Sequence, residues 1–334
     1  MKSVSRGIIA LLLVSAILLF SDLQNRKAAV RQSKLFKIAL VNYIDSPNSE
    51  DCEKGIRQAL EDKGLSENTH FTLKVYNAQG DISTLNSIAG TIGNETWDLV
   101  FALSTPTIQL LSKKLPKTKI VFTNVGDPII AGLGKSFEDH LPNITGISTM
   151  SDFDGLLKLV RYLHPGTMRI GTVFTPAEVN AVSYKDRLAD AAKKIGMELI
   201  AAPANTATEV LDAANTLASQ QIDAFCQISD NLTGSSCSAI LKVSADSKIP
   251  YFGFVTQQLP QGAVGVCARD YFQAGYEAGE MAKEVLSGRD PGKIPYRFVS
   301  KTEYQVNEEH AGFQNIAIPE NIAIEFPGIQ IIKQ

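Results

Sequence analysis

Hydroxyl and carboxyl side chains stand directly after two apolar runs in the first half of the chain. Ser104 and Thr105 follow one run, Asp127 follows the next, and each set precedes a proline. Thr105-Pro106 and Asp127-Pro128 therefore predict helix N-caps with proline in the first turn. Hydroxyls and free N–H groups at a helix start bind anions such as carboxylates. Each turn by itself is better explained as an ordinary helix cap. A binding role is favoured only if the same pattern of polar residues recurs at the ends of other strands.

The pattern does recur along the chain. Predicted strands end in small polar residues at 42–46, 104–106, 124–128, 175–180, 229–231 and 253–256. In an open parallel sheet the carboxyl ends of the strands form the edge where ligands bind. If two such sheets face each other, the six ends converge, which favours a ligand cleft over six separate caps.

The types of these residues indicate the chemistry of the ligand. Ser104 and Thr105 at a helix start suit a carboxylate. Asp230, at a strand end in the second half of the chain and helped by Asn180, suits an ammonium group. An N-cap of the following helix explains Asp230 about equally well.

Aromatic side chains near the same strand ends could enclose an apolar part of the ligand. Tyr43, Phe252 and Phe254 are candidates for walling an apolar or aromatic side chain. Phe252 and Phe254 alternate in a predicted strand, so packing in the core is the other interpretation.

Catalytic and metal-binding motifs are not evident. The four histidines are not spaced for metal binding, and no hydrolase elbow or nucleotide-binding loop occurs. We expect no cofactor, no metal site and no enzyme activity. A hydrolase using Asp127 or Glu178 is the weakest alternative. A disulfide between Cys226 and Cys237 is left open.

Strand and helix signals alternate in two successive blocks. The first runs from a strand at 37–43 to a strand at 120–123, and the second from a strand at 169–174 to a strand at 250–255. The predicted fold class is α/β, with two doubly wound, Rossmann-like parallel-sheet lobes joined by a multi-strand hinge. Further predictions are one helix at 235–245, a helix at 271–286, one strand at 297–305 and a short helix at 310–316.

The last predicted elements are too few to form a third domain, so they must complete the two lobes. We expect the chain to cross between lobes near 148–151, 267–270 and 296–301. The predicted N-terminal lobe is 35–148 plus 268–297, and the C-terminal lobe is 149–267 plus 298–334. Several crossings favour a hinge that closes on a ligand.

The first 34 residues differ in composition from the rest. Lys2 and Arg6 precede a mostly apolar run, Gly7–Phe20, of signal-peptide length. We interpret residues 1–34 as a signal peptide, or alternatively as an uncleaved membrane anchor, and expect the folded part to lie in the periplasm or another extracytoplasmic space. No cysteine follows the run at lipoprotein spacing.

Overall composition excludes several classes of protein. The 334 residues carry a net charge of −3 with 44% hydrophobic residues, which fits two globular domains and gives no basic surface for nucleic acid.

Four segments carry a resemblance to a known family: Phe101–Pro106, Thr123–Leu133, Asn143–Ser148 and Asp270–Gly279. They resemble ABC transporter substrate-binding proteins of the tryptophan- and tyrosine-binding type. The resemblance covers about residues 37–319, and the segment Val125-Gly-Asp-Pro-Ile-Ile-Ala-Gly-Leu133 is its most specific part.

The resemblance implies a type I periplasmic-binding fold and a receptor that delivers a small amino-acid-like, aromatic ligand to an ABC permease. By position, it implies pocket roles for Ser104, Thr105, Gly126, Asp127, Asn180, Asp230 and Asn231. A membrane-anchored sensory receptor with the same fold remains the alternative function.

Overall fold

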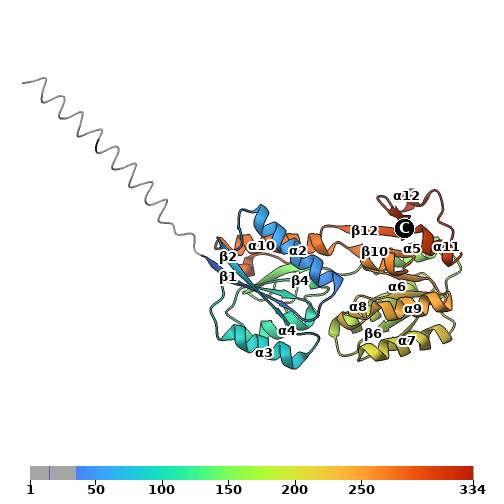
Figure 1. Cartoon of the computed structure of the whole chain (residues 1–334), viewed down its shortest axis with the longest axis horizontal. Coiled ribbons are helices and arrows are strands. Elements are labelled where there is room, and N and C mark those ends of the chain that lie inside the picture. The colour runs from blue at the N-terminus through green and yellow to red at the C-terminus, as the bar shows by residue number, and fades with distance from the viewer. Residues whose placement is uncertain (1–14, 16–34, 334) are drawn as a thin grey trace, which may run out of the picture.

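The computed structural model describes Ser15 and residues 35–333, and residues 35–333 form two α/β lobes side by side (Figure 1). The predicted signal or anchor segment lies outside the described residues, apart from Ser15. In the described part of the chain, no helix has both the length and the apolar character needed to cross a membrane.

The N-terminal lobe is built on a six-stranded sheet in the order β11-β5-β4-β3-β1-β2, with every neighbouring pair parallel. Its strands are β1 (Phe36–Asn42), β2 (Phe71–Asn77), β3 (Leu99–Leu103), β4 (Ile120–Val125), β5 (Ile144–Ser148) and β11 (Arg297–Phe298). Its helices are α2 (Pro47–Asp62), α3 (Ile82–Gly93), α4 (Thr105–Lys114) and α10 (Tyr271–Leu286), with the short 3₁₀ turn η2 (Pro291–Lys293).

The C-terminal lobe has a seven-stranded sheet in the order β13-β12-β10-β9-β8-β6-β7. Its strands are β6 (Arg169–Phe174), β7 (Glu198–Pro203), β8 (Ala224–Gln227), β9 (Tyr251–Gly253), β10 (Gly265–Arg269), β12 (Thr302–Asn307) and β13 (Gln330–Ile332). Its helical segments are α5 (Phe153–Leu163), α6 (Val179–Lys194), α7 (Ala207–Ser219), α8 (Asn231–Ser235), α9 (Cys237–Ser247), η1 (Thr256–Gln261), α11 (Glu308–Phe313) and α12 (Ile322–Glu325). Among the described strands of this sheet, only the pair β10–β12 is antiparallel.

Both sheets share one strand order, so the predicted fold class is confirmed. The order β2-β1-β3-β4-β5 repeats as β7-β6-β8-β9-β10. In each sheet the order reverses between two neighbouring strands, β1 and β3 in one and β6 and β8 in the other. A crevice opens outside the strand ends at such a reversal. The residues that follow the strands at these reversals are 43–46, 104–105, 175–180 and 229–231, and a ligand site there stays a prediction.

Apolar runs become the buried strands. All five residues of β3 are buried, as expected for a strand covered on both faces. Glycines allow α2 and α10 to pack closely over this sheet, because a Cβ on Gly55 would lie 2.0 Å from the carbonyl oxygen of Phe272, and one on Gly275 would lie 2.0 Å from that of Cys52.

The chain passes between the sheets after β5, after β10 and after β11, which are the three regions predicted for crossings. β10 ends at Arg269 in the C-terminal sheet, and β11 includes Phe298 in the N-terminal sheet. The chain therefore changes sheet between Arg269 and Tyr271 and again between Phe298 and Thr302, and the lobe boundaries stay a prediction.

Several local predictions were wrong. Asp127-Pro128 begins a turn rather than a helix, although Asp127 Oδ1 accepts hydrogen bonds from the N–H groups of Ile129 (2.9 Å) and Ile130 (3.1 Å). The single strand predicted at 297–305 is two strands in different sheets, and the helix predicted at 235–245 is the pair α8 and α9.

The cysteines form no disulfide. All four are buried free thiols. Cys237 Sγ lies 3.2 Å from the hydroxyl of Tyr251 and is also 3.3 Å from Nε2 of Gln258. The Cys226–Cys237 pairing left open above is therefore absent from this structure.

Candidate functional site: a cavity between the lobes

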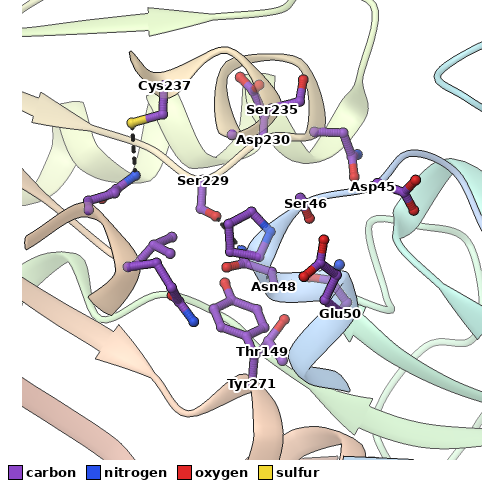
Figure 2. Close-up of a pocket in the computed structure, with 18 of the residues that line it drawn as sticks. Asp45, Ser46, Asn48, Glu50, Thr149, Ser229, Asp230, Ser235, Cys237 and Tyr271 are labelled. Atoms are coloured by element: carbon purple, nitrogen blue, oxygen red, sulfur yellow. Dashed lines mark hydrogen bonds between the residues drawn. The ribbon is translucent and has the colours of Figure 1, made fainter. Parts of the chain in front are cut away.

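A cavity of about 260 Å³ lies at the strand ends between the two lobes (Figure 2). The N-terminal lobe lines it with Asp45, Ser46, Pro47, Asn48, Glu50, Thr105, Asn124, Gly126 and Tyr271, and the C-terminal lobe with Asn180, Tyr184, Ser229, Asp230, Asn231, Gly234, Ser235, Cys237, Ser238, Val255, Gln257, Gln258 and Gln261; Thr149 lies in the crossing segment. We call it the inner cavity. None of these lining residues is a lysine, arginine or histidine.

The N-terminus of α4 is open toward this cavity. Thr105, its first residue, lines the cavity, and the N-cap residue Ser104 makes no side-chain hydrogen bond to the helix N–H groups. Ser104 instead has φ of 83° and lies 3.2 Å, Oγ to Oγ1, from Thr107. An uncapped helix start carries partial positive charge and free donors, so it can hold a carboxylate without a cationic side chain.

Asp230 is a buried carboxylate at the opposite side of the cavity. It is 4% exposed and caps α8, with Oδ1 accepting from the backbone N–H and the hydroxyl of Thr233, both at 2.7 Å. Oδ2 accepts from the N–H of Thr175 at 3.1 Å. Burial, and next the nearby Glu178 charge, raise the pKa of Asp230 to about 7.

Glu178 is a second buried carboxylate close to Asp230. It is 8% exposed, and burial raises its pKa. Its Oε2 accepts hydrogen bonds from the side-chain amides of Asn180 (3.2 Å) and Asn231. In the described part of the chain neither acid forms an ion pair with a cationic side chain. Buried charges in proteins are usually paired, so this pair can accept a cation from a ligand.

Three amide oxygens of the cavity lining are buried and have no hydrogen-bond partner. They are Oδ1 of Asn48, Oδ1 of Asn180 and Oε1 of Gln258. Unpartnered buried acceptors are costly unless a donor reaches them. Together with the two acids, they provide an acceptor-rich wall for an ammonium group.

A second cavity, of about 350 Å³, lies beside the first and also has walls from both lobes. Its lining is Tyr43, Ile44, Gly80, Ile82, Pro106, Gln109, Leu110, Lys113, Thr175, Ala177, Glu178, Asn205, Asn231 and Leu232. We call it the outer cavity. Asn231 lines both cavities, while the bonded neighbours Glu178 and Asn180 line one each.

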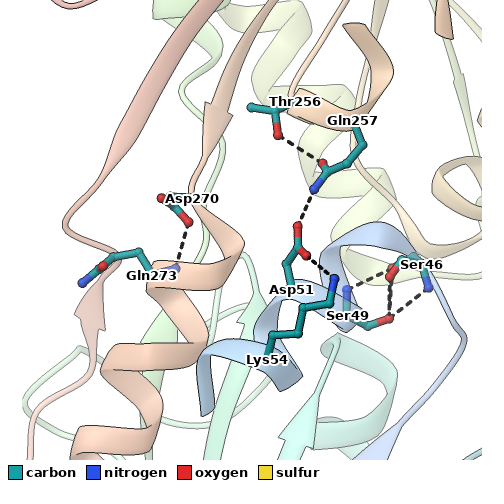
Figure 3. Close-up of polar contacts among 8 residues, drawn as sticks. All are labelled: Ser46, Ser49, Asp51, Lys54, Thr256, Gln257, Asp270 and Gln273. Atoms are coloured by element: carbon teal, nitrogen blue, oxygen red, sulfur yellow. Dashed lines mark hydrogen bonds and ion pairs between the residues drawn. The ribbon is translucent and has the colours of Figure 1, made fainter. Parts of the chain in front are cut away.

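Direct contacts join the two lobes around the inner cavity. Asn48 Nδ2 donates to the hydroxyl of Ser229 at 3.2 Å. The side-chain amide of Gln257 donates to Asp51, one turn into α2, and Figure 3 shows this contact beside the Ser46–Ser49 capping box of the same helix. These contacts place the lobes close together in this structure.

Comparison with known proteins gives a family for this architecture. Residues 37–326 match the family described as ABC transporter substrate binding protein. The chain belongs to this family.

Relatives of this ABC transporter substrate-binding protein are similar over most of its length. A curated tyrosine-binding protein of Clostridioides difficile is 35% identical over 286 residues, which is 86% of this chain and 82% of the relative. A crystal structure of an ABC domain in complex with L-Trp from Streptococcus pneumoniae has a TM-score of 0.85 at 23% identity, covering 90% of this chain and 100% of that one. A ligand-free, open structure of a substrate-binding protein with adhesive properties from Clostridium difficile has a TM-score of 0.69 at 29% identity, with the same coverage.

The structure brings five of the nine sequence-predicted site residues of this substrate-binding protein to the inner cavity. They are Thr105, Gly126, Asn180, Asp230 and Asn231. All five stand at or within a few residues of a strand end, which is why the strand-end pattern detected them. Their contact with a ligand stays a prediction.

The other four lie elsewhere. Ser104 is buried behind Thr105 against Thr107, and Asp127 pairs with Arg187. Tyr43 lines the outer cavity, where its hydroxyl donates to the carbonyl oxygen of Gly80 at 2.6 Å.

The prediction that Phe252 forms an aromatic wall of the ligand site was wrong. Its side chain is fully buried in the hydrophobic core of the C-terminal lobe, as is Phe254, because both face inward from the strand end. The core interpretation therefore applies to both residues, and neither lines a cavity.

Sequence reasoning missed most of the polar lining supplied by helices. Asn48 sits in the first turn of α2, Tyr271 begins α10, and Gln257 and Gln258 belong to η1. Glu178 was considered only as a catalytic group. The Ser46–Pro47 pair was a detectable signal, since it repeats the cap-and-proline pattern of Thr105-Pro106.

Proposed function

We propose that the protein is an extracytoplasmic solute receptor of an ABC importer and binds an amino-acid-like ligand by closing its two lobes. The observation that carries the proposal is the arrangement of opposite charges at the inner cavity. The uncapped start of α4 and the unpaired acids Asp230 and Glu178 lie on opposite lobes.

This arrangement suits a zwitterion. The ligand carboxylate would bind the N–H groups and the Thr105 hydroxyl at the start of α4. Its ammonium group would bind Asp230 and the free Oδ1 of Asn180. Glu178 would supply a second negative charge close to the ammonium group. Since each end is held by a different lobe, the bound ligand stabilises the closed form over the open one.

The aromatic class of ligand is supported by the relatives. One is named as a tyrosine-binding protein, and a solved structure contains L-Trp. We propose an aromatic amino acid or a close analogue as the ligand of this chain, and a membrane permease as the partner that receives it.

Calorimetric titration of the purified protein with the twenty amino acids tests the binding proposal. We expect one or a few aromatic amino acids to bind with 1:1 stoichiometry and to raise the melting temperature by mass action. If no amino acid or close analogue binds or stabilises the protein, the proposal is wrong. Turnover of the ligand during the titration would favour an enzyme instead.

The cellular location is proposed from the N-terminal sequence. N-terminal sequencing of the exported protein distinguishes a cleaved signal from an anchor that retains Gly7–Phe20. Capture of an ABC permease on the ligand-loaded protein supports import, whereas a retained anchor together with capture of a sensor kinase favours a sensory receptor.

A further inference from the structure

We propose that the outer cavity is the subsite for the ligand's side chain, and that this side chain is apolar or aromatic with a hydrogen-bond acceptor at its far end. The inference rests on the proposed function, because it takes the ammonium and carboxylate positions from it. It adds which cavity binds the side chain of the ligand and which residues determine the selectivity among side chains.

Asp230 and Glu178 lie where the two cavities meet, so the side chain of a ligand bound there can enter either cavity. Asn231 lines both cavities, Glu178 lines the outer one and its partner Asn180 lines the inner one. An ammonium held here places the ligand's α-carbon at the junction. The side chain must then extend into one of the two cavities.

The walls of the two cavities differ in polarity. Hydroxyl, amide and carboxyl groups, including Ser46, Ser229 and Gln257, make up most of the inner-cavity lining. Its apolar parts are the rings of Tyr184 and Tyr271 with Pro47, Val255 and Cys237. The outer cavity has apolar walls from both lobes, with Ile44, Ile82, Pro106 and Leu110 on one side and Leu232 on the other. Burial of apolar area against these walls stabilises a hydrophobic side chain in the outer cavity.

Tyr43 forms a fixed part of this wall. Its hydroxyl is held at 2.6 Å by the carbonyl oxygen of Gly80, so its ring is ordered before any ligand arrives. A preordered ring loses little conformational entropy on binding and can pack against an aromatic or aliphatic group.

Helix α4 runs along both cavities, so its residue spacing gives the distance between them. Thr105 lines the inner cavity, whereas Pro106, Gln109, Leu110 and Lys113 line the outer one at helical spacing. At about 1.5 Å per residue, Lys113 lies roughly 12 Å along the axis from Thr105. Among the described residues Lys113 has no ion-pair partner, so its ammonium and the amide of Gln109 can donate to an acceptor at the end of the side chain.

To test the proposal, a tryptophan substitution fills each cavity separately. Calorimetry on the full chain then measures the affinities for L-tyrosine, L-phenylalanine and L-alanine. Ile82→Trp narrows the outer cavity from a position that is 51% exposed, and Ser235→Trp narrows the inner cavity from an exposed position on α8. Ile324→Trp, at a 77% exposed site outside both cavities, is the matched control, and melting temperatures report on folding.

We expect Ile82→Trp to weaken tyrosine and phenylalanine at least tenfold and alanine less than twofold. Lys113→Ala should weaken tyrosine severalfold and leave phenylalanine unchanged. The subsite proposal is overturned if Ile82→Trp leaves tyrosine within twofold of wild type, or if only Ser235→Trp weakens tyrosine more than alanine. A wild-type protein that binds no amino acid overturns the proposed function itself.

Discussion

The guanidinium of Arg187 on α6 lies 2.8 Å from Oδ2 of Asp127, which follows β4 in the other lobe. The pair is an ion pair between lobes, since α6 belongs to the C-terminal sheet and β4 to the N-terminal one. Asp127 therefore bonds to the opposite lobe and does not line the cavity. In this structure the most specific segment of the sequence resemblance contributes to holding the lobes together.

We predict that Arg187→Ala weakens ligand binding by no more than about tenfold and leaves the melting temperature nearly unchanged. The ion pair is partly exposed, at 46% for Arg187 and 14% for Asp127, so its contribution is at most about 1 kcal/mol. The loss should shrink as salt is raised, because screening already weakens the pair. Lys242→Ala, which breaks an exposed pair within α9, is the control and should leave affinity unchanged.

Gly126→Ala should prevent full closure. A Cβ at Gly126 would lie 1.7 Å from the hydroxyl oxygen of Tyr184, which is on the other lobe. We expect an affinity loss above tenfold with little change in thermal stability, because separating the lobes relieves the clash without disturbing either core. Small-angle scattering should show a larger radius for the variant with ligand present.

A rescue experiment separates this steric effect from a general defect. Adding Tyr184→Phe removes the oxygen at 1.7 Å but leaves two ring carbons at 2.5 and 2.7 Å from the new Cβ, so it should restore only a small part of the affinity. Gly166→Ala, at a site where a Cβ meets no atom within 4 Å, should behave as wild type. An unchanged radius in the Gly126→Ala protein would contradict the steric argument.

Ligand affinity should rise with pH through neutrality. The pKa of Asp230 is raised to about 7 in the empty protein, so part of the population is protonated at pH 7. A ligand ammonium favours the ionised carboxylate and lowers that pKa, so binding releases a proton and strengthens from pH 6 to pH 8. Calorimetry in buffers of different ionisation enthalpy measures the released proton, and Asp230→Asn should reduce the release, with Glu178 as the remaining buried acid.

The same residue gives the empty protein a stability trend of opposite sign. Its folded pKa lies above the ordinary value of 3.8, so its contribution to folding is fully present below about pH 4 and is lost as pH rises toward 7. Bound ligand should reduce this loss. Melting curves of wild type and Asp230→Asn, with and without ligand, measure both effects.

Glu178→Gln should stabilise the empty protein and weaken binding. The substitution keeps an oxygen to accept from Asn180 and Asn231 but removes a buried charge that lacks a cationic partner. We expect a rise of a few degrees in melting temperature and an affinity loss of about tenfold. Glu95→Gln, at an exposed site, should change neither quantity.

The sequence was sufficient to predict what depends on local pattern. Apolar runs such as Leu99–Leu103 became buried parallel strands, and the polar residues after them met at the sheet edges. The cap interpretation of Asp230 was also predictable, because its side chain bonds the first turn of its own helix.

What the sequence could not show depends on long-range packing. The sequence around Phe252 does not indicate that its side chain faces the core, because side chains alternate along a strand in the same way whichever face is buried. Asp127 was indistinguishable from a ligand-binding acid because its partner Arg187 is 60 residues away. Both cavities have walls from the two lobes, and no single segment encodes how the lobes meet.

The late return of the chain to its first lobe has a consequence for how the protein folds. Helix α10 packs on α2, and β11 pairs with β5, so residues beyond 270 complete a sheet that begins at Phe36. Contacts of such sequence separation form slowly, because the intervening chain must first be ordered. An N-terminal lobe emerging from the ribosome therefore stays incomplete until nearly the whole polypeptide has been made.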